Sequence, residues 1–290
     1  MTKDHMAGDR MPVACAPPLK LVFVGGGKMG EAIIGGWLRS DEEPAAGIVA
    51  ADMTVVEPGA ERRDYLSRSY GVACVSDAEQ VLAADLVVLA VKPQVMMDVL
   101  AGISPLSAFS RALFVSIAAG LGTARLAPAL PQGSRLVRVM PNTPLLVGEG
   151  ASAVCASPTS TKADVEFVTA LFACLGQAQA VGEDMMDAIG ALSGSGPAYV
   201  AALLESLVRA AVEQGLDEGL AQRFAVQTAL GTMILIDKTG QSPQSVREAV
   251  SSPGGSTLAA LAAMDAAGMD AVYSEGIAAA VRRSKELGAC

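Results

Sequence analysis

The sequence predicts an α/β protein in two parts, a doubly wound sheet in the N-terminal half and an all-helical domain in the C-terminal half. Before about residue 182, short apolar runs alternate with stretches of helical spacing, as in a parallel sheet covered by helices. From about Glu183 the β-branched runs stop and long helical stretches follow. The length of 290 residues fits about two domains.

Six apolar runs in the first half are expected to form strands. The run Asp85–Val91 is continuous, as expected for a strand that is covered on both faces. Two stretches between the runs, 31–40 and 60–70, have helical spacing. The expected strands are residues 19–24, 53–58, 85–91, 113–120, 135–140 and 151–156.

Three long helices are expected in the second half, at residues 197–216, 220–240 and 271–288. The first is apolar around most of its circumference, so we expect it to be buried on all sides. A domain of this size cannot bury such a helix alone, which favours a homodimer with intertwined helices over a monomeric bundle. The predicted domain boundary lies at Gly182–Asp184.

The composition argues against several classes of partner and site. The net charge is −9, and Lys/Arg residues cluster no further than short pairs, which disfavours nucleic acid and anionic membrane surfaces. No apolar run reaches the roughly 18 residues of a membrane span. The five cysteines form no CxxC pair, so we predict neither disulfides nor a metal site, but free thiols in a reducing cytoplasm.

Residues 1–18 lack the apolar core of a signal peptide and are predicted to be a disordered tail of a cytoplasmic protein. This tail contains His5, the single histidine of the chain. Catalytic triads, Cys–His pairs and histidine metal sites would all depend on it, and they are therefore nearly excluded.

Gly25, Gly27 and Gly30 stand in GxGxxG register directly after a predicted strand and open a helix, with Lys28 and Met29 between them. This context indicates a Rossmann-like dinucleotide site. The first glycine permits a tight turn, the second lets the pyrophosphate approach, and the third allows close packing of helix and strand. The helix N-terminus then faces the phosphates.

The choice between NADH and NADPH stays open at this level. Glu57 ends the second predicted strand, where an acid accepts the ribose 2′-OH of NAD and repels a 2′-phosphate. Arg62 and Arg63 follow closely. They could pair with such a phosphate or be solvated helix charges.

Further cofactor contacts are expected where later parallel strands end, because cofactors lie at that edge. Lys92 could be a catalytic cation, a phosphate contact or a plain strand-end charge. Asn142, in a Pro-Asn-Thr-Pro turn, could contact the nicotinamide side or serve only the turn, and Ser193–Gly196 could border the nicotinamide or serve close helix packing. The expected contacts at these strand ends are Val91, Lys92, Pro93, Ala118, Ala119, Gly120 and Asn142.

The stretch "SSPGGST" breaks a region that otherwise has helical spacing. Gly254 and Gly255 free the backbone, and a helix beginning at Ser256 would present several N–H donors to one small anion. The alternative is a plain helix–helix turn.

Six motifs occur together in order: "FVGGGKMGEAIIGGW", "AVKP", "VSIAAG", "RVMPNTP", "ALSGSGPAYV" and "SSPGGSTL". With them the chain resembles the pyrroline-5-carboxylate reductases from about Leu19 to Leu287. The resemblance implies a dinucleotide-binding domain at 19–182 and a helical dimerisation and substrate-binding domain at 183–290. It also implies an active site shared between subunits, with dimers that often form decamers.

The implied reaction is the reduction of 1-pyrroline-5-carboxylate to L-proline, usually with NADPH and sometimes with NADH. By the resemblance, Ser252 and the N–H groups of Gly255 and Ser256 match the contacts to the substrate carboxylate, with Gly254 in the same loop. Thr257 matches the hydroxyl near the imine nitrogen. With no histidine available, Thr257 and Lys92 are the catalytic candidates. Glu57 stands where NADP-preferring members often carry a neutral residue.

The sequence argues against two rival functions. A β-hydroxyacid dehydrogenase needs a lysine soon after a Ser-Gly-rich turn, and this chain has none between Lys162 and Lys238. A non-catalytic nicotinamide sensor would need no substrate loop, so the intact "SSPGGST" argues against it.

Overall fold

The computed structural model describes residues 19–39, 47–104 and 110–289. The predicted tail, 1–18, and His5 lie outside the described residues. The chain divides into two compact units. One comprises the described residues up to Gly194 together with those from Val281 onward, and the other is residues 195–280.

The first unit contains a sheet of eight strands in the order β3-β2-β1-β4-β5-β6-β7-β8. All six predicted strands are present. The first six strands run parallel, which confirms the predicted doubly wound α/β fold. The strands are β1 (Leu21–Val24), β2 (Met53–Val56), β3 (Ala73–Val75), β4 (Leu86–Leu89), β5 (Leu113–Ser116), β6 (Arg135–Met140), β7 (Gly150–Ala156) and β8 (Gly176–Val181).

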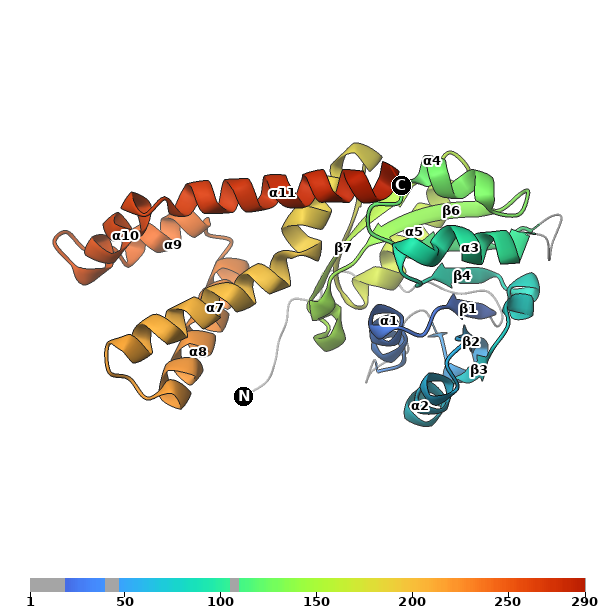
Figure 1. The fold of residues 1–290 in the computed structure, drawn as a ribbon, viewed down its shortest axis with the longest axis horizontal. Coiled ribbons are helices and arrows are strands. Elements are labelled where there is room, and N and C mark those ends of the chain that lie inside the picture. Colours follow the sequence, from blue (N-terminus) through green and yellow to red (C-terminus); the bar gives the residue numbers. More distant parts are fainter. Residues whose placement is uncertain (1–18, 40–46, 105–109, 290) are drawn as a thin grey trace. The chain divides into compact units, whose positions relative to one another are not determined.

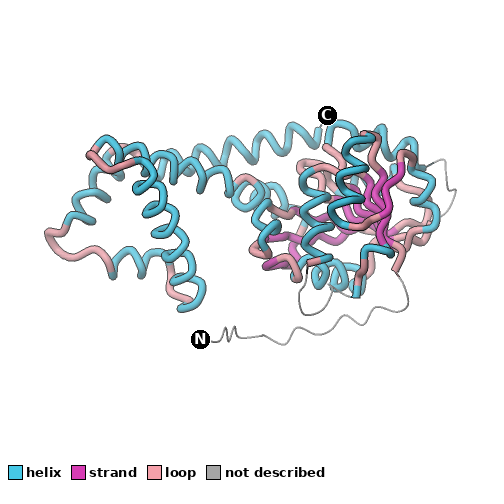
Figure 2. The backbone as a smooth tube through the Cα atoms, turned by 90° about the horizontal axis from the view of Figure 1, so that it is seen from below, coloured by secondary structure: helices cyan, strands magenta, loops and turns pink. Residues whose placement is uncertain are grey.

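Helices cover both faces of this sheet (Figures 1 and 2). Leu21 and Phe23 of β1 face one core, and Val22 and Val24 face the other, because successive side chains of a strand point to opposite faces. The first core is covered by α1 (Lys28–Leu38), α2 (Ala60–Tyr70) and α5 (Lys162–Ala173), and the second by α3 (Pro93–Ile103) and α4 (Thr123–Leu126).

Trp37, the single tryptophan, joins α1 to β1 and α5. It is fully buried, and its Nε1 donates a hydrogen bond to the carbonyl of Leu171 (3.0 Å). Its ring meets those of Phe23 and Phe172 at centroid distances of 5.6 and 5.8 Å in tilted and edge-on geometry, which aromatic pairs favour. The core on this face therefore fixes α1, the helix that opens the glycine loop.

The last two strands depart from the predicted parallel arrangement. β7 pairs antiparallel with β6, and β8 pairs parallel with β7. The connection between β6 and β7 holds only the short turn η6 (Thr143–Val147). A parallel crossover needs about a dozen residues or more, so this connection permits only an antiparallel return.

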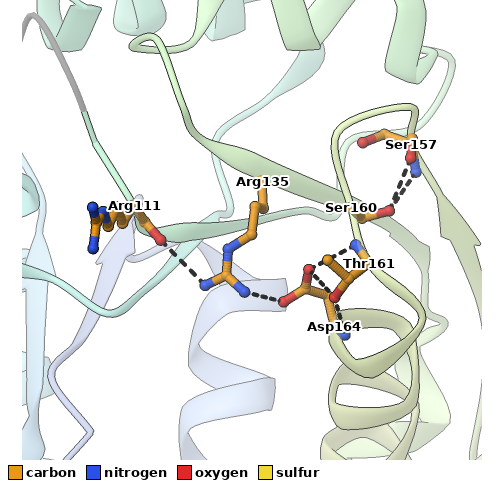
Figure 3. Close-up of polar contacts among 6 residues, drawn as sticks. All are labelled: Arg111, Arg135, Ser157, Ser160, Thr161 and Asp164. Carbon is orange, nitrogen blue, oxygen red and sulfur yellow. Dashed lines mark hydrogen bonds and ion pairs between the residues drawn. The ribbon is translucent and has the colours of Figure 1, made fainter.

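A polar network at the amino end of β6 ties that strand to α5 (Figure 3). Arg135 pairs with the buried Asp164 and also donates to the carbonyl of Arg111 (3.1 Å). Asp164 and Thr161 form a reciprocal cap at the start of α5. Beside them the Ser157 N–H donates to the hydroxyl of Ser160 (2.9 Å). This network lies at the end of β6 opposite to its carboxyl end, so its role is structural.

The second unit is helical, as predicted. It holds α7 (Gly196–Glu213), α8 (Glu218–Thr239), α9 (Pro243–Ala249), α10 (Ser256–Ala266) and the first part of α11 (Met269–Ala289). Asp217 caps α8 by accepting a hydrogen bond from the Leu220 N–H (3.0 Å). Gly240 ends the same helix in the left-handed conformation (φ +65°).

This unit has almost no core of its own. Of its apolar residues only Ala221 and Val246 are buried. The helix from Pro197 is thus not buried within the single chain, and its burial on all sides by a second copy stays a prediction. The exposed large apolar residues of the unit are Val200, Leu203, Leu207, Val212, Leu216, Phe224, Val226, Leu230, Met233, Ile234, Leu235, Val250, Leu258, Met264, Val272 and Tyr273.

Candidate active site

The predicted cofactor residues follow the carboxyl ends of β1, β2, β4, β5 and β6. Because these strands are parallel, their ends open at one edge of the sheet. The loops after β1 and β4 meet there, since the Ala90 N–H donates to the Val24 carbonyl (2.8 Å). Strand order reverses between β1 and β4, and such a switch point is where open α/β sheets bind ligands.

The three glycines of the loop have three different surroundings. Gly25 has φ +104°, and a Cβ there would lie 2.9 Å from the backbone of Ala90. A Cβ at Gly30 would lie 2.7 Å from the Gly25 carbonyl oxygen, so this glycine allows α1 to pack closely. A Cβ at Gly27 would meet nothing within 4 Å. The loop therefore presents open space at the glycine that a pyrophosphate approaches, and the residues present fit a dinucleotide.

Lys28 and Met29 differ in their surroundings. Lys28 is exposed at the first residue of α1, beside the open side of Gly27. Met29 is partly buried and packs against the core of this face. Lys28 therefore offers an accessible positive charge to a ligand, whereas Met29 contributes to the core.

The carboxylate of Glu57 bridges two loops. Its Oε2 accepts a hydrogen bond from the Gly26 N–H, and its Oε1 accepts one from the Gly59 N–H, both at 3.0 Å. Gly26 belongs to the glycine loop, so the carboxylate lies directly beside that loop. An ionised carboxylate has about four acceptor positions, and hydrogen bonds from the described part of the chain occupy two of them.

Arg62 is hydrogen-bonded to the backbone of the glycine loop. Its Nε donates to the Gly26 carbonyl (2.6 Å), and its Nη2 pairs with Glu31 (2.5 Å). Glu31 also accepts hydrogen bonds from the hydroxyls of Tyr65 (2.8 Å) and Tyr70 (2.9 Å). Burial raises the pKa of Glu31, but these hydrogen bonds and the charge of Arg62 outweigh it, so the pKa lies below its ordinary value. Burial and the neighbouring carboxylate raise the pKa of Tyr70 to about 12.

Arg63 is engaged as well. Its Nη1 donates to the carbonyls of Glu57 (2.8 Å) and Pro58 (2.7 Å). Both arginines of the pair are therefore bound to neighbouring groups and are not simply solvated.

Lys92 follows β4 and caps α3, whose first residue is Pro93, a usual helix opening. Its side chain is exposed, and no hydrogen bond or ion pair joins it to another described residue. Val91 lies against the glycine loop, since a Cβ at Gly25 would be 2.9 Å from its Cγ1. Lys92 is thus an exposed cation at the carboxyl end of β4, and its predicted role as a phosphate contact or catalytic cation stays a prediction.

The loop after β5 contacts the end of α11. Gly120 has φ +77°, and a Cβ there would lie 3.0 Å from the Ser284 carbonyl oxygen and 3.1 Å from Leu287 Cβ. Arg125 donates to the Gly288 carbonyl (2.9 Å). Of the other predicted residues in this loop, Ala118 is buried and Ala119 is partly buried. The sequence did not predict this packing of the C-terminal helix end.

Asn142 connects two of the motifs. Its Nδ2 donates to the carbonyl and hydroxyl oxygens of Ser193 (3.3 and 3.2 Å), and its Oδ1 accepts from the Ala151 N–H (2.8 Å). Ser193 lies in η8 (Gly190–Gly194), a turn of π-helix, a type that often occurs at functional sites. These contacts support the turn role of Asn142, and its predicted contact to the cofactor stays a prediction.

A buried arginine was missed by the sequence analysis. Arg138, in the middle of β6, pairs with Glu183 (2.5 Å), which also accepts a hydrogen bond from the Cys155 thiol (3.3 Å). The Nε and Nη2 atoms of Arg138 are buried without a partner among the described residues. Burial raises the pKa of Cys155 to about 12, with the neighbouring carboxylate adding to the effect, so the thiol is unreactive. The only feature of the sequence that could have indicated this buried pair is the presence of an arginine within the apolar run of β6.

The predicted substrate loop lies in the helical unit. Gly254 has φ +73°, and the Gly255 N–H donates to the Ser252 carbonyl (2.9 Å), which closes a tight turn. Gly255 is the N-cap of α10 and has no side chain to accept a hydrogen bond, so the N–H groups of the first turn have no side-chain cap among the described residues. Ser256 is exposed and Thr257 partly exposed. The turn presents a set of backbone donors.

Within the described ranges, no group of three or more His, Cys, Asp or Glu side chains is arranged to hold a metal ion. None of the helices described is both long and apolar enough to cross a membrane. The described cysteines, Cys74, Cys155 and Cys174, form no disulfide with one another.

Comparison with known proteins gives two family models and relatives that match along most of the chain. Residues 183–287 match the family described as pyrroline-5-carboxylate reductase dimerisation, and residues 20–120 match that of coenzyme F420-dependent NADP oxidoreductases. The pyrroline-5-carboxylate reductase of Synechocystis is 37% identical over 93% of this chain and 98% of its own, and that of Escherichia coli is 34% identical over 92% and 98%.

Solved structures agree. The pyrroline carboxylate reductase of Plasmodium falciparum, solved with NADP bound, is 31% identical with a TM-score of 0.82 over 93% of this chain and 98% of its own. The enzyme of Coxiella burnetii is 32% identical with a TM-score of 0.83 over the same shares. The chain therefore belongs to the pyrroline-5-carboxylate reductase family, a family of NAD(P)H-dependent oxidoreductases.

Proposed function

We propose that the chain reduces 1-pyrroline-5-carboxylate to L-proline, the last step of proline biosynthesis, with the glycine loop holding the dinucleotide and the 252–257 loop holding the substrate. The observation that carries the substrate assignment is the turn before α10. It presents unpaired backbone N–H groups at a helix start, in the unit that matches the dimerisation domain of this family.

The residues at the sheet edge position the dinucleotide. Gly27 leaves the space that the pyrophosphate needs, and the N-terminus of α1 stabilises its negative charge. Lys28, the first residue of α1, and Lys92, the N-cap of α3, are exposed cations and add charge pairing. When bound, NAD(P)H supplies a hydride to the imine carbon.

The substrate carboxylate binds to the loop before α10. The backbone N–H of Ser256 and the hydroxyl of Ser252 donate to it, and Gly254 allows the tight turn that brings them together. The Gly255 N–H donates to the Ser252 carbonyl (2.9 Å), so it reaches the carboxylate only by sharing that hydrogen bond. No arginine is needed, because several N–H donors at a helix start stabilise one anion.

Thr257 orients the ring. Its hydroxyl forms a hydrogen bond with the imine nitrogen, and the substrate binds already protonated there, because a threonine hydroxyl is too weak an acid to be the sole proton source. The hydride forms the new C–H bond, the C=N double bond becomes a C–N single bond, and the nitrogen keeps its proton. Most of the rate comes from holding both reactants in attack geometry.

The assembly is a homodimer through the helical unit, and such dimers associate further into decamers. The exposed apolar residues of α7 and α8 support the dimer, since a second copy would bury them. The net charge of −9 supports the absence of a nucleic-acid partner, and the odd number of five cysteines without a CxxC pair supports a cytoplasmic location.

Replacement of Thr257 tests the substrate loop. Thr257→Ala should lower kcat while the Kd of the dinucleotide changes little, and Thr257→Ser, which keeps the hydroxyl, should restore much of kcat. Ser245→Ala, on the neighbouring helix α9, serves as the control. Unchanged turnover in Thr257→Ala would remove the assignment of this loop.

A further inference from the structure

We propose that this chain prefers NADH to NADPH, and that Glu57 sets this preference by accepting the ribose hydroxyls of the adenosine. The assay of this inference rests on the proposed reaction. The observation behind it is the placement of the Glu57 carboxylate, fixed between two loops at the end of β2.

Glu57 is held in place before any ligand binds. The N–H groups of Gly26 and Gly59 each donate to one of its oxygens at 3.0 Å. A Cβ at Gly26 would lie 3.3 Å from Oε2, and one at Gly59 would lie 3.2 Å from Oε1. The carboxylate therefore lies against two glycine backbones, and its remaining acceptor positions match the two hydroxyls of a ribose.

The two arginines that could bind a 2′-phosphate are already engaged. Arg62 is bound to Glu31 and to the Gly26 carbonyl, and its guanidinium stacks on Tyr65 at 5.0 Å. Arg63 is bound to the carbonyls of Glu57 and Pro58. A 2′-phosphate would have to displace these contacts to recruit either arginine.

The charged side chains around Glu57 also disfavour binding of a 2′-phosphate. The two carboxylates, Glu31 and Glu57, balance the two guanidiniums, Arg62 and Arg63, so the group carries no net positive charge. A phosphate bearing nearly two negative charges would face the Glu57 carboxylate at close range. Repulsion between such charges a few ångströms apart in partly hydrated surroundings corresponds to a preference of roughly tenfold or more.

The first measurement is a pair of kcat/KM values for NADH and NADPH at saturating pyrroline-5-carboxylate. NADH should be favoured roughly tenfold or more in the unmodified protein. Glu57→Gln removes the charge but keeps the shape, and it should raise kcat/KM for NADPH and lower the NADH/NADPH ratio at least about fivefold. Glu61→Gln, an exposed neighbour with the same change of charge, should leave the ratio unchanged.

A second measurement does not depend on turnover. Calorimetric titration with adenosine 5′-monophosphate and with adenosine 2′,5′-bisphosphate compares the two adenosine ends directly. The unmodified protein should bind the monophosphate more tightly, and Glu57→Gln should narrow the difference. Tighter binding of the bisphosphate by the unmodified protein alone would contradict the proposal.

The proposal is overturned if NADPH is used at least as well as NADH and the bisphosphate binds more tightly, above all if Arg62→Gln or Arg63→Gln then abolishes that advantage. Failure of the proposed reaction would look different. Neither reduced dinucleotide would then be consumed with pyrroline-5-carboxylate, while the order of the two adenosine phosphates would still support or contradict the role of Glu57.

Discussion

The buried guanidinium of Arg138 pairs with the carboxylate of Glu183 across 2.5 Å, and the two side chains differ sharply in exposure, at 4% and 38%. The pair joins the middle of β6 to the residue at which the match to the dimerisation family begins. Arg138 has no other partner for two of its three nitrogens among the described residues. The positive charge of Arg138 is therefore compensated mainly by Glu183, whereas the carboxylate of Glu183 is also in contact with solvent.

This asymmetry predicts unequal costs for breaking the pair. Glu183→Ala leaves an uncompensated buried charge and should lower the free energy of unfolding by about 3 kcal/mol or more. Arg138→Met should cost less, because the freed carboxylate of Glu183 can turn toward water and the thioether chain fills the space. Urea denaturation measures both, with Glu166→Ala, at an exposed ion pair, as a control that should change little. Equal costs for the two variants would contradict the asymmetry.

The protein should lose stability in acid. Burial raises the pKa of Glu183 and of Glu31, but hydrogen bonds and charge from Arg138 and Arg62, respectively, outweigh it, so both pKa values lie below the ordinary range. Such carboxyls stabilise the fold above their unfolded pKa of about 4.3, and that contribution is lost as the pH falls through the folded pKa.

The melting temperature should therefore fall steeply below about pH 4 and hardly change between pH 6 and 8 on account of these groups. Glu31→Gln should make the acid fall shallower, while Glu166→Gln, at an exposed position, should leave the profile parallel to that of the unmodified protein. An unaltered acid profile in Glu31→Gln would show that this carboxyl does not contribute.

The glycine loop predicts that binding and stability can be separated. Gly27→Ala meets no protein atom, so the melting temperature should be preserved while the Kd of NADH rises at least about tenfold, or about 1.4 kcal/mol. Gly30→Ala forces a Cβ against the Gly25 carbonyl and should cost roughly 1–3 kcal/mol of stability.

The matched control for both glycine variants is Gly102→Ala. Gly102 is exposed within α3 and a Cβ there meets nothing within 4 Å, so alanine should be neutral or stabilise the helix slightly. Unimpaired dinucleotide binding in Gly27→Ala would show that the pyrophosphate does not approach this glycine.

The exposed apolar side chains of the helical unit predict obligatory association. Phe224 on α8 is 66% exposed in the single chain, and a charged residue at a buried interface is costly. Phe224→Asp should shift the protein to smaller species in analytical ultracentrifugation. Val147→Asp, at a position of the sheet unit that is 75% exposed, is the matched control and should sediment like the unmodified protein.

Much of the fold followed from periodicity. Continuous apolar runs such as Asp85–Val91 predicted the buried strands, because a strand covered on both faces needs no polar alternation. β8 was missed because its sequence, GQAQAV, contains small and polar residues with weak preference for strands, and it lies at the edge of the sheet. The strand β7 was predicted but its antiparallel direction was not, because strand direction depends on the length of a connection and not on the strand itself.

The site was predictable where backbone geometry determines the residue type. Gly25 and Gly254, both with positive φ, and Gly30, at a close approach, are recognisable in sequence because few other residues fit. Side-chain partners were not predictable. That Glu57 would be held by Gly26, or that Asn142 would bind Ser193, depends on loops brought together by the sheet, 31 and 51 residues apart in the chain.

The most direct test of the whole account is to incubate the purified protein with 1-pyrroline-5-carboxylate and either NADH or NADPH, and to measure dinucleotide oxidation together with proline. The account predicts one proline formed for each dinucleotide oxidised. A folded protein that binds the dinucleotide but forms no proline with either would contradict it.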